Sequence, residues 1–335
     1  MLRSFMTFAV LAFAAVCQGI SQQTSQPAAA ASVGQPSSSV QTVQNEDWSK
    51  LPVDRTVLPS YPRGTLLGKD DKDTFSREII RFEWRAGDAV EVYVIKPHGV
   101  EKPQAILYLY GIPSDTDRFR DDQWCRHATS HGLAAIGFIS AMTGGRYKGR
   151  PMKQWFVSEL QEAMGSSAHD VQLIVDYVAS RKDLSADHVG MFAQGSGAAI
   201  AILTASVDPR ITVLDLLNPW GDWPDWLRTS PVVPENERPN YVTPEFLEKV
   251  SGLDPARYLP QLSDRKLRVQ QVMDYADVPP APRDKIAASV PAGSLVQYKD
   301  KAAHEQAWHA NGLSGWIAGQ FTADHSAVAA KTKLP

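Results

Sequence analysis

Short apolar runs alternate with amphipathic segments along most of this chain. Residues 105–110 are apolar without interruption, which is typical of a strand buried on both faces. Residues 155–179 repeat their apolar side chains at helical spacing, with a break expected near Gly165. This alternation predicts an α/β fold, a mostly parallel twisted sheet with helices on both faces. We expect strands at 79–86, 89–96, 105–110, 134–138, 189–192, 212–217, 268–273 and 295–298, and helices at 121–131, 155–179, 198–206, 243–250, 285–289 and 315–320.

The segment 189–199 joins one of these strands to an Ala-rich helix through a turn of small residues. The turn reads Ala193-Gln194-Gly195-Ser196-Gly197. A nucleophile elbow holds a catalytic serine at such a junction, in the pattern Gly-x-Ser-x-Gly. Here Gly195 stands at the central position, and Ser196 follows one residue later. Whether the chain is a catalyst depends on this register.

The flanks of this turn resemble the dienelactone hydrolase and secreted esterase/peptidase branch of the α/β-hydrolase superfamily. The resemblance rests on Asp187, on Val189-Gly190-Met191 in the strand, and on Asp208-Pro209-Arg210-Ile211 beyond the helix. Both flanks align without a gap only if Gly195 takes the nucleophile position. That backbone conformation costs a non-glycine residue about 1–3 kcal/mol, whereas glycine adopts positive φ freely. The resemblance therefore implies an α/β-hydrolase fold with a degenerate elbow, with Ser196 as the alternative nucleophile in a shifted register.

The resemblance also implies a backbone oxyanion hole. Family members often follow the strand at 105–110 with His-Gly and a loop whose amide binds the oxyanion, and this chain has Tyr110-Gly111-Ile112. The amides of Ile112 and Ser196 are then the expected donors, and Tyr110 is a departure from the family pattern. We expect Tyr110, Gly111, Ile112 and Gln194 to border a ligand; the alternative is an ordinary strand-to-loop turn.

Acid and base candidates follow the last two strands, in the chain order of the α/β-hydrolase triad. Asp277 and Asp274 both follow the strand at 268–273, and neither fits the family spacing without a one-residue shift. His304 stands where the family has its base, and we expect it in a loop that reaches over the elbow. His309 is the competing histidine. The alternatives are turn aspartates and a surface histidine.

An insert at 218–262 contains three tryptophans at three-residue spacing, Trp220, Trp223 and Trp226, with interleaved prolines. We interpret this segment as an aromatic wall or short cap over the site rather than a helix seam. The alternative is packing of an irregular segment on the sheet edge.

The N-terminus has the layout of a secretory signal peptide at 1–21, with Arg3 before an apolar run too short to span a bilayer and small residues after it. Val16 before Cys17 disfavours lipidation. Residues 22–44 are rich in Gln, Ser, Ala and Pro, which is typical of a disordered tether. The sequence thus predicts a secreted or periplasmic protein with one α/β-hydrolase domain at 45–335.

Composition narrows the partners. A formal net charge of −3 offers no electrostatic basis for binding nucleic acid or an anionic membrane. No motif predicts a cofactor or a metal site. The expected partner is a small-molecule ligand or an ester- or peptide-like substrate. Three functions stay open: a catalytically silent ligand-binding protein, a serine hydrolase using Ser196 with His304 and an aspartate, and non-covalent chemistry using His304 and an aspartate.

Overall fold

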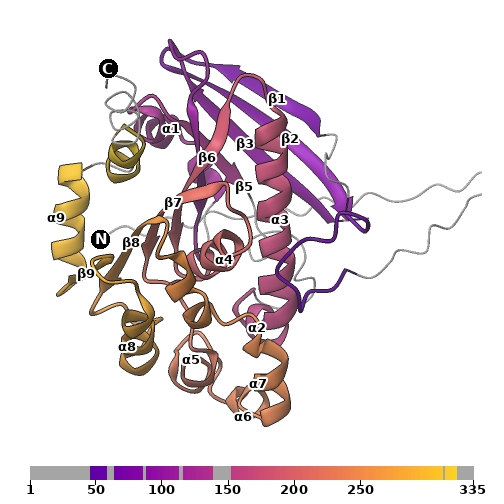
Figure 1. Ribbon diagram of the computed structural model, residues 1–335, viewed down its shortest axis with the longest axis vertical. Coiled ribbons are helices and arrows are strands. Elements are labelled where there is room, and N and C mark those ends of the chain that lie inside the picture. Colours follow the sequence, from indigo (N-terminus) through magenta and orange to yellow (C-terminus); the bar gives the residue numbers. More distant parts are fainter. Residues whose placement is uncertain are drawn as a thin grey trace, which may run out of the picture. The chain divides into compact units, whose positions relative to one another are not determined.

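The strands of the described chain form one twisted sheet. The computed structural model describes residues 46–58, 64–85, 88–112, 116–138, 152–311 and 314–322. Within these ranges the strand order is β1-β2-β3-β5-β4-β6-β7-β8-β9 (Figure 1). Pairing is antiparallel from β1 through β3 to β5 and parallel from β5 through β4 to β9. The strands are β1 (Thr65–Asp71), β2 (Phe75–Arg85), β3 (Asp88–Pro97), β4 (Gln104–Leu109), β5 (Ala134–Phe138), β6 (Ser185–Gln194), β7 (Ile211–Leu217), β8 (Lys266–Val272) and β9 (Leu295–Tyr298).

Helices cover both faces of this sheet, as the sequence predicts. The side chains of β4 show why: Leu107 and Leu109 face the core formed with α3 and α4, whereas Ile106 and Tyr108 face the core formed with α1 and residues 315–322. The labelled helices of the described chain are α1 (Asp122–Thr129), α2 (Met152–Ser158), α3 (Leu160–Ser180), α4 (Ser196–Ala205), α5 (Trp223–Thr229), α6 (Arg238–Tyr241), α7 (Pro244–Ser251), α8 (Pro280–Ser289) and α9 (Lys301–Asn311).

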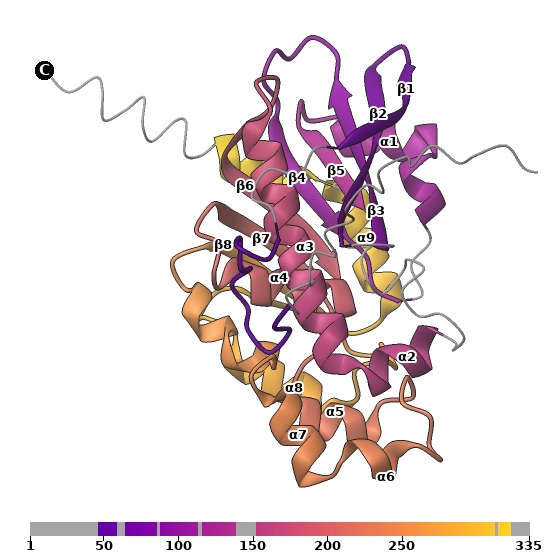
Figure 2. The same cartoon turned by 90° about the vertical axis from the view of Figure 1, so that its right-hand side faces the viewer.

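The insert at 218–262 follows β7 and contains α5, α6 and α7. Two short 3₁₀ helices, Pro255–Arg257 and Leu259–Leu262, complete it before β8 begins. Figure 2 shows α5, α6 and α7 gathered at one end of the sheet. The capped helix expected at 243–250 is confirmed, since Thr243 Oγ1 accepts a hydrogen bond from the amide of Phe246 at 3.2 Å.

Two local expectations are wrong. The predicted helix at 155–179 breaks at Glu159, between α2 and α3, and not at Gly165. Gly165 has a packing role instead, because a Cβ there would lie 2.2 Å from the carbonyl oxygen of Trp48. Strand β1 was missed because its side chains are mostly exposed at a sheet edge, so its sequence lacks an apolar alternation.

Residues 46–58, which we call the N-terminal strap, pack against α3. Leu51 and Val53 are buried, and the Val53 amide donates to Gln172 Oε1 at 3.1 Å. The first residue of the strap, Glu46, makes an ion pair with Arg85, which also pairs with the fully buried carboxylate of Asp170. Although burial opposes ionisation, hydrogen bonds from Arg85 and His169 lower the pKa of Glu46 to about 2. The strap is thus held by a charge cluster as well as by apolar contacts.

We expect Glu46→Gln to lower the free energy of unfolding by about 1.5–3 kcal/mol at neutral pH, because Arg85 keeps its burial and loses a charged partner. Because the folded-state pKa of Glu46 is depressed, its contribution is present above the unfolded value near 4.3 and is lost as the pH falls towards 2. Urea denaturation measures the change. The matched control is Glu83→Gln, which removes a charge from an exposed pair with Arg81 and should cost well under 1 kcal/mol. Equal effects of the two substitutions would contradict this account of the strap.

Candidate functional site

The strand-to-helix turn between β6 and α4 has the backbone of an elbow. Gly195 stands alone between the two elements, with φ 58° and ψ −121°. Its amide donates to the carbonyl oxygen of Leu217 at 2.9 Å, and its carbonyl oxygen accepts from the amides of Ala199 and Trp220. Residues with a side chain rarely adopt this positive-φ backbone conformation, whereas glycine adopts it without strain. The positive φ expected for Gly195 is present.

The chain after β4 packs directly on this turn. A Cβ on Gly111 would lie 3.0 Å from the carbonyl oxygen of Gln194, and a Cβ on Gly197 would lie 2.5 Å from that of Leu109. Both glycines are therefore required by close backbone approach. The contact brings the amide of Ile112 within 3.0 Å of Ser196 Oγ, to which it donates a hydrogen bond.

That hydrogen bond changes the expected roles of both residues. Ser196 is fully buried at the first turn of α4, and its hydroxyl oxygen accepts from the backbone. The Ile112 amide, expected as an oxyanion donor, is already paired. No hydrogen bond links Ser196 with His304 in the described chain. The hydroxyl of Ser196 thus ties the loop after β4 to the elbow.

Aromatic side chains stand over Gly195, where a nucleophile would project. A Cβ built on Gly195 would lie 3.4 Å from Trp220 Nε1 and 3.7 Å from the hydroxyl of Tyr275. The Tyr275 hydroxyl donates to Asp277 Oδ2 at 3.1 Å, and burial raises the pKa of Tyr275, so the phenol stays protonated. Gly195 itself is buried. Tyr275 and Trp220 therefore occupy the approach to the elbow.

The candidate acids and the candidate base are not joined. Asp277 accepts from Tyr275, and Asp274 Oδ2 accepts from the amide of Lys301 at 3.4 Å. His304 lies on α9 rather than in the expected loop, and its Nε2 is buried without a hydrogen-bond partner in the described chain. Burial lowers the pKa of His304, against the opposing charge of Asp215. The triad geometry is therefore absent among these described residues.

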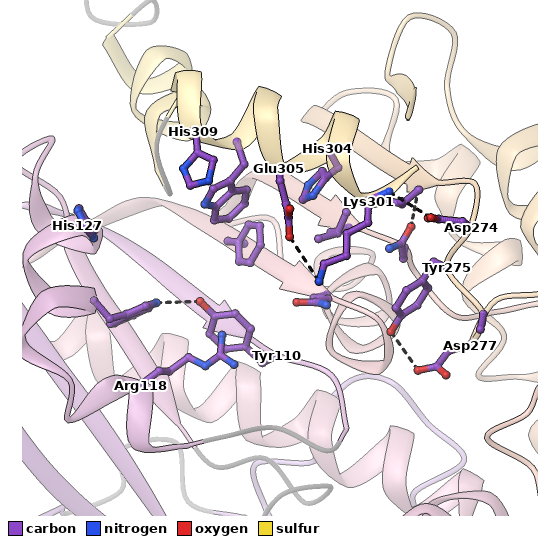
Figure 3. A pocket seen from close by; sticks show the side chains of 18 residues that line it. Tyr110, Arg118, His127, Asp274, Tyr275, Asp277, Lys301, His304, Glu305 and His309 are labelled. Atoms are coloured by element: carbon purple, nitrogen blue, oxygen red, sulfur yellow. Dashed lines mark hydrogen bonds and ion pairs between the residues drawn. The ribbon is translucent and has the colours of Figure 1, made fainter. Parts of the chain in front are cut away.

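A cavity of about 1000 Å³ lies beside the elbow, lined by residues from both halves of the chain (Figure 3). Of the expected site residues, this cavity is lined by Tyr110, Gln194, Asp274, Asp277 and His304. It is not lined by Gly111, Ile112, Gly195, Ser196 or the three tryptophans of the insert. His309, the competing histidine, lines it too.

Several residues that line the cavity are not predicted by the sequence pattern. They include Arg118, Trp124, Phe192, Lys301, Glu305 and Trp308. The one available signal was helical spacing, because Lys301, Glu305 and Trp308 share a face of α9 with His304. That signal was missed because the segment was interpreted as a loop. Among the described residues no cluster of three or more His, Cys, Asp or Glu side chains is arranged to hold a metal ion, and none of the helices there has the length and apolarity to span a bilayer.

The three tryptophans of the insert do not line the cavity, although Trp220 stands over Gly195. Trp220, Trp223 and Trp226 are buried in a cluster with Phe156, with ring centroids of Trp220 and Trp226 4.8 Å apart. Trp223 and Trp226 lie on a helix, α5, contrary to the expectation from the interleaved prolines. Pro224 lies in its first turn, where proline is tolerated. The indole N–H of Trp226 donates to the carbonyl oxygen of Asp277 at 2.9 Å. The cluster thus anchors the loop that carries Tyr275 and Asp277.

No protein-family model matches this chain, and no curated protein sequence matches it significantly. Similar solved structures exist. Acetyl xylan esterase 1 from a Thermoanaerobacterium species has a TM-score of 0.55 at 15% identity, over 71% of this chain and 82% of that one. An acetyl xylan esterase from a Paenibacillus species has a TM-score of 0.55 at 17% identity, over 75% and 87%. The acylaminoacyl peptidase of Pyrococcus horikoshii has a TM-score of 0.51 at 14% identity, over 68% and 37%. The chain has the α/β-hydrolase fold.

A pH-dependent loss of stability should trace to His304. Because its folded-state pKa is depressed, the unfolded chain binds more protons below about pH 6.5, and the free energy of unfolding falls as pH is lowered through that value. His304→Phe should therefore lose less stability than the parent between about pH 7.5 and about pH 5. Urea denaturation at both pH values measures this. The exposed His188, changed to Gln, serves as control and should keep the parental loss; an unchanged loss in His304→Phe would exclude His304 as the cause.

Proposed function

We propose that this protein is a catalytically silent member of the hydrolase fold that binds a small organic ligand in the cavity beside its elbow. The observation that carries the proposal is Gly195 at the turn between β6 and α4, in a positive-φ conformation that would strain any residue with a side chain. We infer that this is the nucleophile position, which then lacks a hydroxyl. The solved structures of similar fold are esterases and a peptidase, so a cavity of this kind beside the elbow is where a substrate-like ligand is expected.

The surroundings of Gly195 support loss of the acyl-transfer reaction. Such a reaction requires a nucleophile within hydrogen-bond reach of its base and free donors for the oxyanion. The Ser196 hydroxyl is buried and holds the Ile112 amide. His304 Nε2 has neither a nucleophile nor an acid bound to it in the described chain. The cavity meanwhile keeps aromatic and polar side chains suited to holding a ligand.

The test is labelling with a fluorophosphonate probe, which reacts with activated serines, together with hydrolysis of a short-chain acyl ester. We expect no labelling and no hydrolysis above the buffer rate, with an active esterase of the same fold as positive control. Ser196→Ala should leave both readings unchanged. Robust labelling of the parent that Ser196→Ala abolishes would overturn the proposal and make Ser196 a nucleophile.

We also propose that the chain is exported, on the signal-peptide layout of residues 1–21. These residues, and the proposed tether at 22–44, lie outside the described part of the chain. Amino-terminal sequencing of the protein recovered outside the cytoplasm should place the mature end between residues 18 and 22. A chain that retains Met1 in the cytoplasm, or that carries a lipid on Cys17, would contradict this.

A further inference from the structure

One side of the cavity is a continuous row of rings, which we call the aromatic belt: Trp124, Tyr110, Phe192, Trp308 and His304. The indole N–H of Trp124 donates to the Tyr110 hydroxyl at 3.1 Å. Ring centroids then follow one another at 5.9 Å from Tyr110 to Phe192, 5.3 Å to Trp308 and 5.8 Å to His304. All five side chains line the cavity. A row of rings from four separate elements favours a flat ligand that stacks or packs edge-on.

A cation lies at one end of this belt. The guanidinium carbon of Arg118 is 3.6 Å from the centroid of the Tyr110 ring, and Arg118 lines the cavity. This is a cation–π contact, and the fork of N–H groups on a guanidinium matches a carboxylate. His127 and His309 lie on the same side of the cavity as Arg118 in Figure 3. This end of the cavity is therefore suited to an anionic group.

Each carboxylate of the cavity makes a contact with another lining residue. Asp277 accepts from Tyr275, and Asp274 accepts from the backbone of Lys301. Glu305 lies 3.5 Å from Lys301 Nζ. Figure 3 shows Asp274 and Asp277 across the cavity from Arg118. The cavity thus has a cationic end and an acidic end, with rings between them.

We propose that the cavity binds an aromatic carboxylate, its ring on the aromatic belt and its carboxylate directed to Arg118. This inference rests on the proposed ligand-binding function and names the ligand class. The cavity volume, about 1000 Å³, accommodates one or two fused rings with room for substituents. Arg118 is then the residue that sets specificity for the anion.

The experiment is calorimetric titration of the full chain with 2-naphthoate and with its neutral counterpart, 2-naphthamide. We expect naphthoate to bind about tenfold more tightly, which is the effect of one charge-assisted contact. Arg118→Gln should remove this preference while it leaves the affinity for naphthamide unchanged. Arg118→Lys should restore only part of the preference, because it keeps the charge and loses the planar fork.

The matched control is Arg120→Gln. Arg120 is the nearest arginine along the chain, contacts Tyr93 and Glu91, and does not line the cavity. It should keep the parental preference. Equal binding of naphthoate and naphthamide, no binding of either, or a loss in Arg118→Gln that is the same for both compounds would overturn the inference. The fluorophosphonate experiment is independent of these outcomes, so catalytic silence stands or fails separately.

Discussion

The close approach of the chain after β4 to the turn between β6 and α4 constrains the rest of the site. Two glycines permit it, since Cβ atoms at Gly111 and Gly197 would each meet a backbone carbonyl oxygen at 3.0 Å or less. At this separation the Ile112 amide needs an acceptor, because a buried N–H without one is costly. The Ser196 hydroxyl is that acceptor. The amide that the family resemblance implies as an oxyanion donor is therefore paired with Ser196.

The tryptophan cluster of the insert also contacts the elbow and the loop that follows β8. Trp220 lies directly over Gly195, and Trp226 holds the carbonyl oxygen of Asp277. Asp254 completes the anchoring, since its buried carboxylate accepts from the amides of Asp222 and Trp223. These contacts fix the loop that carries Tyr275 above the elbow.

Gly195 is thus separated from the cavity, although its neighbour Gln194 lines it. Tyr275 and Asp277 form a hydrogen-bonded pair between them, and Gly195 does not reach the cavity surface. His304 faces the cavity from α9, with its ring between Tyr298 and Trp308. Its depressed pKa keeps the ring neutral near physiological pH, so it contributes as an aromatic surface more than as a charge.

The local pattern of apolar and small residues predicts most strands of this protein and the turn at Gly195. Apolar runs predicted eight of the nine strands in the described chain, and the segment 193–197 predicted a turn with positive φ at Gly195. Both predictions succeed because strand burial and positive φ are short-range demands on side-chain type. Tertiary structure alone decided what surrounds Gly195. The Ile112–Ser196 hydrogen bond joins residues 84 positions apart, and Tyr275 and Trp220 reach Gly195 from other elements. Tertiary structure also decided the surroundings of the three tryptophans and of His304. Three-residue spacing did not reveal whether the indoles face a cavity or a core. The helix that carries His304 packs this ring against Tyr298 and its Trp308 against Phe192, and both partners lie outside the helix. Such choices follow from which surfaces meet in the fold, and a one-dimensional pattern does not contain that information.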